Sequence, residues 1–587
     1  MGQLAMAVEN AEVARILKEL ADLLEIQGAN AFRVRAYRNA ARVIEELAES
    51  VEELAREGPK RLTELPGIGA DLAGKIVEIV ETGSLRALAE AAREVPKSLI
   101  TLLRVRGLGP RRAKALHDAL GITSVPELAA AARAGRIREL RGFAEKTEQR
   151  ILAELEARRA AGDERRLLRP IAAQYAETCL KYVRAIPGVT QADVAGSFRR
   201  CRETVGDLDI LVASLDGSLA VDGFLSYPEV EEVLAHGPTK ASVRLRSGLQ
   251  VDLRVLAPDS YGAGLHYFTG SKAHNIAIRR LGQQRGLRIS EYGVFRGRRQ
   301  IGGRTEEQVF AAVGLPWIPP ELREDRGEID AAREGRLPRL VTLGDIRGDL
   351  QIHTTDSDGR DTLEQMAVAA EAIGYEYIAV TDHTPAVRVA GGLDRQGFRR
   401  QMRRINALNA RLKRLTVLCG AEVDILPDGR LDLDDGTLAA LDLVVVSVHS
   451  KLDLPEPRQT ERLLRALAHP AVDVLGHPTG RLLGRRAPMR FDLERVLRAA
   501  KSHGVLVEVN AQPERLDLDD VACRAAVDLG VGLVISTDAH ATPELHFMRW
   551  GVEQARRGWA EQRHVATTLP LRALLRLLRG RRGKAVA

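Results

Sequence analysis

Two acidic residues on one short apolar strand constrain this chain more than any other feature. Residues 206–212 read GDLDILV, which predicts a β-strand entered through a glycine turn. Side chains alternate between the two faces of a strand, so Asp207 and Asp209 point the same way. Carboxylates this close repel each other unless a hard cation such as Mg²⁺ lies between them. A solvated sheet face is the structural alternative for an isolated Asp-x-Asp.

A third acid lies in the run LQVDLRVL, where Asp252 faces away from the apolar side chains of its own strand. The preceding Ser247 and Gly248 predict a hairpin that brings this strand alongside the first. Three acids on neighbouring strands form a two-metal site, the arrangement that clamps the attacking and leaving oxygens in phosphoryl transfer.

The surrounding residues carry a family resemblance. Residues 196–211, GSFRRCRETVGDLDIL, resemble the nucleotidyltransferase signature of family X DNA polymerases, the DNA polymerase beta family, and YFTGSKAHN at 267–275 resembles that family's nucleotide-pocket motif. The resemblance implies that Asp207, Asp209 and Asp252 are catalytic and bind two Mg²⁺ or Mn²⁺ ions. Lys272 departs from the eukaryotic pattern, which has an acid there. The implied nucleotide-binding set is Ser197, Arg200, Gly206, Tyr267, Phe268, Gly270, Lys272, Asn275 and Arg279.

Composition sets the outer limits. The 587 residues are 45% hydrophobic, enough for three to five domains. The net charge of +7 and the excess of arginine over lysine favour a polyanionic partner, although a solvated surface explains them equally well. The four cysteines lie far apart without a CxxC pair, which indicates a reduced protein without disulfides. Without a membrane-spanning run or a signal peptide, we expect a cytoplasmic, nucleoid-associated protein.

A repeated turn marks the N-terminal part. LPGIGADLAGKI, VRGLGPRRAKAL and LRGFAEKTEQRI, starting at residues 65, 105 and 140, follow the helix-hairpin-helix pattern, whose glycines permit a tight turn and whose helix amides cradle a phosphate. The third copy has Ala144 in place of the second glycine, which favours a structural role. An upstream helix combines arginines with an aromatic residue, as suits a DNA backbone or a solvated face. The expected DNA contacts are Tyr37, Gly67, Gly69, Gly107, Gly109 and Arg111.

Lys75 follows the first hairpin. The resemblance aligns it with the lysine that forms a Schiff base with an abasic sugar in the lyase domain of the family; a solvated helix lysine is the alternative. Asp71, one turn earlier, stands where the family has a basic residue. A nearby carboxylate holds an ammonium group in its charged form, which argues against lyase activity.

Beyond residue 345, apolar strand-like runs alternate with helical stretches and end in acids and histidines. This pattern predicts an α/β barrel with its site at the C-terminal ends of the strands. The motifs resemble a polymerase and histidinol phosphatase (PHP) domain, which implies a distorted barrel holding up to three Mn²⁺ or Zn²⁺ ions. Gln351 departs from the usual His-x-His, and an amide is a poor ligand for these metals. The implied ligands are Gln351, His353, Asp358, His383, Glu422, His449, His477, Asp538 and His540.

The expected fold class is multidomain, with helical helix-hairpin-helix N-terminal domains, an α/β nucleotidyltransferase palm and a C-terminal distorted α/β (PHP) barrel. The expected boundaries are 1–90 for a lyase-like DNA-binding domain, 91–160 for a fingers-like domain, 161–259 for the palm, 260–320 for a thumb-like nucleotide-selecting subdomain, 321–344 for a linker and 345–580 for the PHP phosphoesterase.

The resemblance implies a monomeric DNA-directed DNA polymerase that fills short gaps in base excision repair, using dNTPs on gapped or primer–template DNA. It also implies a metal-dependent 3′→5′ exonuclease in the PHP domain, extending to abasic sites or blocked 3′ ends. Two alternatives stay open: a polymerase whose barrel is only structural, and a non-catalytic DNA-binding scaffold.

Overall fold

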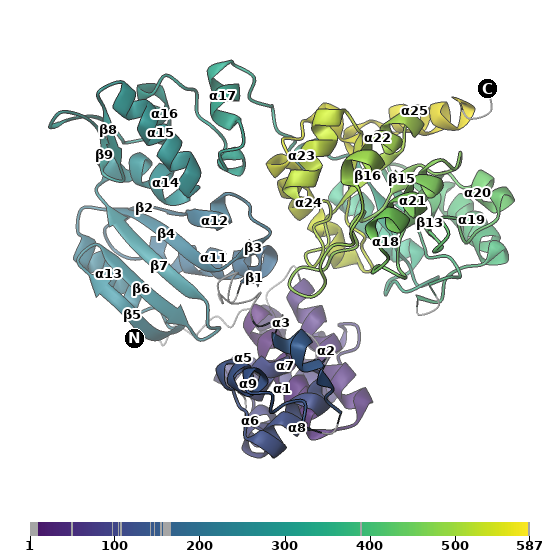
Figure 1. Cartoon of the computed structure of the whole chain (residues 1–587), viewed down its shortest axis with the longest axis horizontal. Helices are drawn as coiled ribbons and strands as arrows, with labels where there is room; N and C mark the ends of the chain where they lie inside the picture. The colour runs from purple at the N-terminus through teal and green to yellow at the C-terminus, as the bar shows by residue number, and fades with distance from the viewer. Residues whose placement is uncertain are drawn as a thin grey trace.

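The computed structural model describes residues 10–47, 51–96, 98–103, 105, 108–140, 142–145, 147–152, 155, 166–387 and 390–584. Figure 1 shows a helical N-terminal body, a palm sheet with a second subdomain above it, and a C-terminal α/β barrel. The multidomain fold class expected from the sequence is confirmed.

The N-terminal body is a bundle of helices around one apolar core that extends from Val13 to Leu155. The two expected helical domains therefore share a single core. Most of the helices are short and amphipathic, so tertiary packing rather than helix propensity stabilises them. The helices are α1 (Asn10–Gln27), α2 (Ala31–Glu46), α3 (Val51–Arg56), α4 (Pro59–Thr63), α5 (Ala70–Thr82), α6 (Arg86–Glu94), α7 (Leu99–Leu103), α8 (Pro110–Leu120) and α9 (Val125–Arg133).

The palm, within the continuously described residues 166–256, is a five-stranded sheet with strand order β2-β4-β7-β6-β5. Strands β6 and β7 form the hairpin predicted at Ser247 and Gly248, and β7 runs parallel to β4. The elements are β1 (Leu167–Leu168), α11 (Arg169–Arg184), β2 (Val189–Val194), α12 (Gly196–Arg199), β3 (Thr204–Val205), β4 (Asp207–Ser214), α13 (Gly217–Leu225), β5 (Val230–Gly237), β6 (Lys240–Leu245) and β7 (Gln250–Leu256).

The thumb-like subdomain packs helices around Phe310 and beside a small antiparallel sheet. Glu306 fastens it to the palm, because its carboxylate lies 2.7 Å from Arg199 Nη1 and 2.6 Å from Arg323 Nη1. The elements are η1 (Pro258–Ser260), α14 (Tyr261–Thr269), α15 (Lys272–Gln284), β8 (Arg288–Ser290), β9 (Gly293–Arg296), β10 (Arg299–Gly302) and α16 (Glu306–Ala312).

The segment expected to be a linker is folded. It contains η2 (Pro320–Leu322), α17 (Glu328–Arg333) and η3 (Leu343–Asp345). Two of its charged residues are buried in ion pairs: Arg323 is fully buried, and Glu328 Oε1 lies 2.7 Å from Nδ1 of the buried His274. Most of the others, such as Arg333 and Arg336, are exposed, so the segment is held to the neighbouring domains by a few internal ion pairs within an otherwise solvated charged surface.

The C-terminal barrel consists, among the described residues, of seven parallel strands in the order of the chain. A bridge between Ile352 and Ala539 brings the last strand beside the first. The strands are β11 (Gly348–Ile352), β12 (Tyr377–Val380), β13 (Thr416–Asp424), β14 (Leu443–Ser447), β15 (Val474–Leu475), β16 (Leu506–Asn510) and β17 (Leu533–Ser536).

Helices surround these strands and close the barrel. Leu574 and Leu578 on α25 pack against the inner layer of apolar side chains, while the other helices pack against the outer face of the strands. The helical elements are α18 (Leu363–Ile373), α19 (Arg395–Asn409), α20 (Asp435–Ala440), α21 (Glu456–Leu467), α22 (Leu493–His503), α23 (Asp520–Leu529), η5 (Thr542–Phe547), α24 (Met548–Arg557), η6 (Gln562–His564), η7 (Ala566–Thr568) and α25 (Leu571–Lys584).

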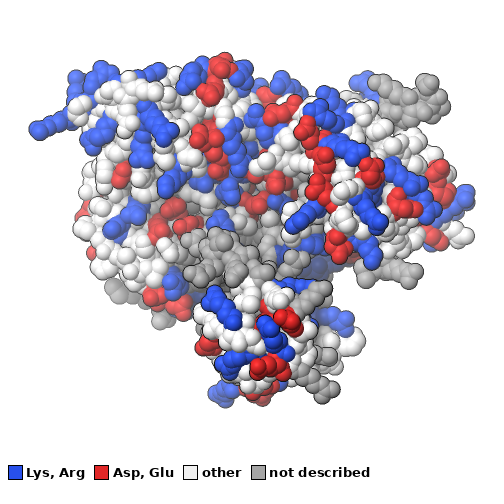
Figure 2. Space-filling model, in the orientation of Figure 1, with Lys and Arg blue, Asp and Glu red and all other residues white. Residues whose placement is uncertain are grey.

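Surface composition matches the sequence analysis in part. All four cysteines are buried and free. Of the helices that the structure describes, none is long and apolar enough to cross a bilayer. Figure 2 shows basic side chains gathered over β8 and β9 and spread across the barrel, interleaved with acids; Arg296, Arg298 and Arg299 are exposed on that thumb hairpin.

Gly348, the first residue of β11, packs closely against β12. A Cβ at this position would lie 2.3 Å from the backbone oxygen of Tyr377, so Gly348→Ala must push β11 away from β12. We expect it to lower the free energy of unfolding of the barrel by about 3 kcal/mol, the upper end for overpacking. Gly344→Ala, whose nearest neighbour lies at 3.9 Å, is the matched control. Equal urea-denaturation midpoints for the two variants would contradict the expectation.

Candidate catalytic centres

The three palm acids share one face of the sheet. Strands β4 and β7 are in parallel register with Asp209 opposite Asp252, and Asp207 lies two residues before Asp209. Because side chains two residues apart share a face, the three carboxylates project together. Burial, followed by repulsion from Asp207 and Asp252, raises the pKa of Asp209 to about 7.

The signature helix α12 is fitted closely to these acids. Gly196 has φ of +61°, and a Cβ there would lie 2.2 Å from Oδ2 of Asp209. The backbone N–H of Ala195 donates to the carbonyl of Asp209 at 2.7 Å. The signature therefore requires a glycine at this position, because any side chain would collide with the carboxylate of Asp209.

The expected nucleotide residues lie around this face. Tyr267 and Phe268 are half-buried near the end of α14, with ring centroids 5.2 Å apart and nearly perpendicular planes. Asn275 donates from Nδ2 to the carbonyl of Tyr267 at 2.7 Å, which ties α15 to α14. Ser197 lies on α12 and Gly206 directly precedes β4; Gly270 ends α14, and Lys272 and Arg279 are exposed on α15.

Arg200 follows α12 and is largely buried. Its Nη1 donates to the carbonyl of Thr269 at 2.5 Å, and its Nε donates to Glu324 at 3.1 Å. Glu324 lies in the segment interpreted as a linker and is not among the residues expected from the sequence. A carboxylate two residues after an apolar turn gives no sequence signal for this contact.

The first two helix hairpins have the geometry expected for phosphate binding. Gly67 has φ of +75°, and Gly69 and Gly109 are the N-caps of α5 and α8 without any side-chain cap bond, which leaves helix N–H groups free to bind an anion. A Cβ added at either N-cap glycine would have no neighbouring atom within 4 Å. Gly107 lies outside the described residues, as does the side chain of Arg111.

The expected DNA contact of Tyr37 is wrong. Tyr37 is 2% exposed and packs in the helical core, so it cannot reach DNA. The helix turns its apolar face inward, so the tyrosine belongs to that face, and Phe32 near the helix start is exposed instead, with the Arg35 guanidinium 4.6 Å from its ring. Lys75 forms an ion pair with Asp71, the carboxylate that the sequence places one turn earlier.

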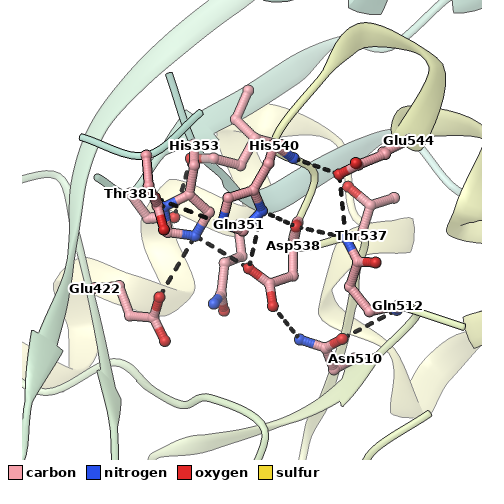
Figure 3. Close-up of polar contacts among 12 residues, drawn as sticks. Gln351, His353, Thr381, Glu422, Asn510, Gln512, Thr537, Asp538, His540 and Glu544 are labelled. Atoms are coloured by element: carbon pink, nitrogen blue, oxygen red, sulfur yellow. Dashed lines mark hydrogen bonds and ion pairs between the residues drawn. The ribbon is translucent and has the colours of Figure 1, made fainter. Parts of the chain in front are cut away.

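Along the inward-facing side of the barrel strands, apolar side chains give way to acidic ones toward the C-terminal ends. Leu418 and Leu506 belong to the inner apolar layer, and side chains further along the same face of each strand are polar, namely Glu422 and Glu508. Figure 3 shows side chains from different strands, among them His353, Glu422 and Asp538, pointing toward one another at this end of the barrel.

Seven of the nine expected barrel ligands lie, among the described residues, in three overlapping clusters, and within each cluster the candidate ligand atoms lie within 4.8 Å of one another. Gln351 and His477 belong to none of the three clusters. Glu422 joins two of them: its Oε1 lies 3.3 Å from His449 Nε2 and 2.8 Å from His477 Nε2, and its Oε2 lies 3.3 Å from His383 Nδ1. His353 Nε2 lies 3.1 Å from Asp538 Oδ1. The clusters are His353, Asp358, His383 and His540; His383, Glu422 and His449; and His353, Glu422 and Asp538.

Charge balance in the barrel differs from that in the palm. Burial would lower the pKa of His449, but Glu422 and Asp424 outweigh it and raise the pKa to about 9. His383, where burial dominates, has its pKa lowered to about 4. Burial opposes ionisation of Asp358, yet His540 and the neighbouring imidazoles lower its pKa to about 2.

The donor set fits divalent metal ions. His383 Nδ1 and Glu422 Oε2 are buried and have no hydrogen-bond partner, and both residues belong to clusters that could hold a metal ion. Imidazole and carboxylate donors in overlapping groups are the chemistry that Mn²⁺ and Zn²⁺ favour. In the palm, burial and repulsion from Asp207 and Asp252 raise the pKa of Asp209, and a bound cation would relieve that repulsion.

Gln351 lies within this set as an amide. Both side-chain atoms, Oε1 and Nε2, are buried without a hydrogen-bond partner. Figure 3 shows the amide between Glu422 and Asp538. Asp424 is not among the residues expected from the sequence. Its carboxylate accepts a hydrogen bond from the backbone N–H of His449 at 3.1 Å and lies 3.1 Å from the ring Nδ1, so it orients that ring.

Four family models match the chain: a helix-hairpin-helix domain at residues 8–85, a SAM-like helix-hairpin-helix tandem at 99–157, the DNA polymerase beta thumb at 264–324 and the PHP domain at 349–512. These matches place helix-hairpin-helix, polymerase and PHP sequence in one chain, in the order in which the structure has the corresponding folds.

Relatives extend these matches to the whole chain. The DNA polymerase/3′-5′ exonuclease PolX of Bacillus subtilis is 37% identical over 567 residues, covering 96% of this chain and 98% of that protein. DNA polymerase lambda of Arabidopsis thaliana is 26% identical over 54% of this chain and 62% of its own length. A probable phosphatase of Thermoanaerobacter sp. is 29% identical over 33% of this chain and 79% of its own length. The chain belongs to the family X DNA polymerases that carry a C-terminal PHP domain.

Proposed function

We propose that this protein fills short gaps in DNA during repair and removes nucleotides from 3′ ends with its barrel. The observation that carries the polymerase function is the parallel register that sets Asp209 beside Asp252, with Asp207 on the same face. The similarity to a DNA polymerase/3′-5′ exonuclease over almost the full length supports both activities.

In the palm, Asp207, Asp209 and Asp252 would hold two Mg²⁺ or Mn²⁺ ions, which supply Lewis acidity toward the primer 3′-hydroxyl and the triphosphate. Arg200 and Ser197 would bind the triphosphate, and the arginine would neutralise charge on the departing pyrophosphate. The half-buried rings of Tyr267 and Phe268 would lie against the deoxyribose; the two rings form a rigid wall through their perpendicular contact. The remaining expected nucleotide contacts are Gly206, Gly270, Lys272, Asn275 and Arg279.

In the barrel, the three histidine–acid clusters would hold up to three Mn²⁺ or Zn²⁺ ions, whose Lewis acidity supports phosphodiester hydrolysis. Asp424 would keep the His449 ring in position, since it contacts that ring directly. We extend this activity to abasic sites and blocked 3′ ends. Gln351 favours a second candidate, a barrel with one weakened metal position, because its amide cannot donate as an imidazole does.

The N-terminal hairpins would hold gapped or primer–template DNA through its phosphates. The Asp71–Lys75 ion pair argues against a lyase reaction, because it engages the amine that would have to attack the abasic sugar. We propose that the protein acts as a monomer on DNA and dNTPs, in the cytoplasm and associated with the nucleoid.

The two centres are expected to be chemically separable. Asp207→Ala with Asp209→Ala should abolish primer extension, by about a thousandfold or more, because about 4 kcal/mol of transition-state stabilisation is lost with the metal ligands. The nuclease activity and DNA affinity of this variant should stay near wild type. His383→Ala, or Asp538→Ala with His540→Ala, should do the reverse.

Extension and nuclease assays on the same labelled primer–template, with and without dNTPs, make the comparison. Circular dichroism of each variant must accompany them, because metal binding can itself stabilise the barrel. If the palm variant is folded and binds DNA but has lost its nuclease activity, the assignment of extension to the palm and of nuclease activity to the barrel is wrong.

Gln351 is expected to limit metal binding. Gln351→His should raise the metal retained by the barrel after gentle chelation, or change which metal is preferred, because an imidazole is the stronger donor. Elemental analysis of wild type and variant measures this. Gln283→His, at an exposed position on α15, controls for an added surface histidine. Equal metal content in all three proteins would place Gln351 outside the metal shell.

DNA affinity is expected to depend on the open helix N-termini. Wild-type affinity should fall steeply with added salt and vary little with DNA sequence. Gly69→Asp should cap α5 and place a negative charge where the phosphate binds, lowering DNA affinity about tenfold while leaving thermal stability unchanged or higher. Ala144→Asp, at the same position of the third repeat, should have little effect. Fluorescence anisotropy at several salt concentrations measures both, and equal losses for the two variants would contradict a phosphate role for the first hairpin.

A further inference from the structure

Helix α24 of the barrel lies against the polymerase signature of the palm. Arg557, at the end of α24, donates from Nη1 to the backbone carbonyl of Arg200 at 2.5 Å and to Glu324 at 3.1 Å. Its Nη2 donates to Asp520, at the start of α23, at 2.5 Å. One barrel side chain thus connects the barrel wall to the segment that follows α12.

These charges are removed from water. The side chain of Arg557 is 2% exposed, that of Glu324 is 11% exposed and that of Arg200 is 14% exposed. A buried guanidinium is tolerated only when its donors are paired, and removing one member of such a network leaves an uncompensated charge. The arrangement of the three groups is therefore fixed by their mutual contacts.

Glu324 is shared between two arginines. Its Oε1 accepts from Arg200 Nε and from Arg557 Nη1, both at 3.1 Å. Arg200 also donates from Nη1 to the carbonyl of Thr269, and this second hydrogen bond holds another edge of the guanidinium in place. With Nε and Nη1 held in this way, the orientation of the plane is set before a nucleotide arrives, which lowers the entropy cost of binding a triphosphate.

We propose that Arg557 is a positioning residue for DNA synthesis: through Glu324 and the carbonyl of Arg200, the barrel orients the arginine that receives the incoming triphosphate. This inference rests on the proposed role of Arg200 in the palm. Without Arg557, the carbonyl of Arg200 loses its donor, and Glu324 keeps only Arg200 at 3.1 Å and Arg202 at 3.9 Å as partners. Arg200 is then held more strongly by the carboxylate, in competition with phosphate oxygens.

Single-nucleotide incorporation into gapped DNA tests this in the full-length protein. Arg557→Met should raise the KM for dNTP about tenfold with kcat changed less than about twofold, because ground-state orientation of the triphosphate is lost while the metal acids are intact. Nuclease activity and DNA affinity should not change. Arg556→Met is the matched control: Arg556 lies on the same helix and interface but binds Glu321 and the carbonyl of Val341, away from the signature.

A double-mutant cycle separates positioning from general weakening of the interface. In an Arg200→Ala background, Arg557→Met should raise KM by less than about twofold, because the group that it positions is already gone. Glu324→Gln, which keeps the shape and removes the charge, should give a smaller increase in KM that is likewise lost in that background, and it serves if Arg557→Met fails to fold.

The outcomes are distinct. A wild-type protein that incorporates no nucleotide contradicts the proposed polymerase function itself. If wild type is active but Arg200→Ala leaves KM unchanged, Arg200 does not receive the triphosphate and the proposal fails. Equal KM values for Arg557→Met and Arg556→Met, or full additivity with Arg200→Ala, would also overturn it.

Discussion

Repulsion between carboxylates buried at strand ends is the constraint on which both centres depend. In the palm, the strand register places Asp209 against Asp252. Burial, followed by repulsion from Asp207 and Asp252, raises the pKa of Asp209 to about 7, and Arg254 and Arg200 offset only part of this rise. In the barrel, Glu422 lies among three imidazoles that lower its pKa. The palm therefore depends on cations that arrive from solution, whereas the barrel balances much of its negative charge with its own histidines.

The same physics holds the domains together. Arg169 pairs with Glu553 of the barrel, Arg481 of the barrel lies 2.7 Å from Glu203, and Arg557 bridges the signature segment. Arginine suits such contacts because its guanidinium binds carboxylates and carbonyls through several donors in one plane. The interface is thus built from directional bonds, which fix how the two domains are oriented as well as how strongly they adhere.

The sequence predicted the fold class well, because its signals are local: a glycine turn before an acidic strand, glycine hairpins before helices, and apolar runs that end in histidine. Family membership is confirmed by the relatives. The roles of the individual site residues stay predictions, although the barrel set converges in space as expected. Tyr37 was misplaced because an aromatic beside arginines resembles a DNA surface, and only the packing of α1 against α2 decides which face is buried.

The folded segment and the contacts of Arg557 could not be predicted for a different reason. Glu324 and Arg557 are more than 230 residues apart in sequence, and each has an ordinary charged neighbourhood. Charge-rich runs are usually solvated, so nothing in the composition distinguishes an internal ion pair from a surface tether. Three-dimensional packing alone identifies such pairs, since it shows which charges have lost water.

The exchange of charges across the interface has an evolutionary consequence. Glu203, Glu321 and Glu324 on one side meet Arg481, Arg556 and Arg557 on the other. If recombination joined the first 344 residues to an unrelated barrel, these glutamates and arginines would face partners of the wrong shape or charge. Several buried charges would then be left uncompensated. The two halves are therefore matched to each other, and a charge-reversing substitution on either surface would require a compensating change on the other.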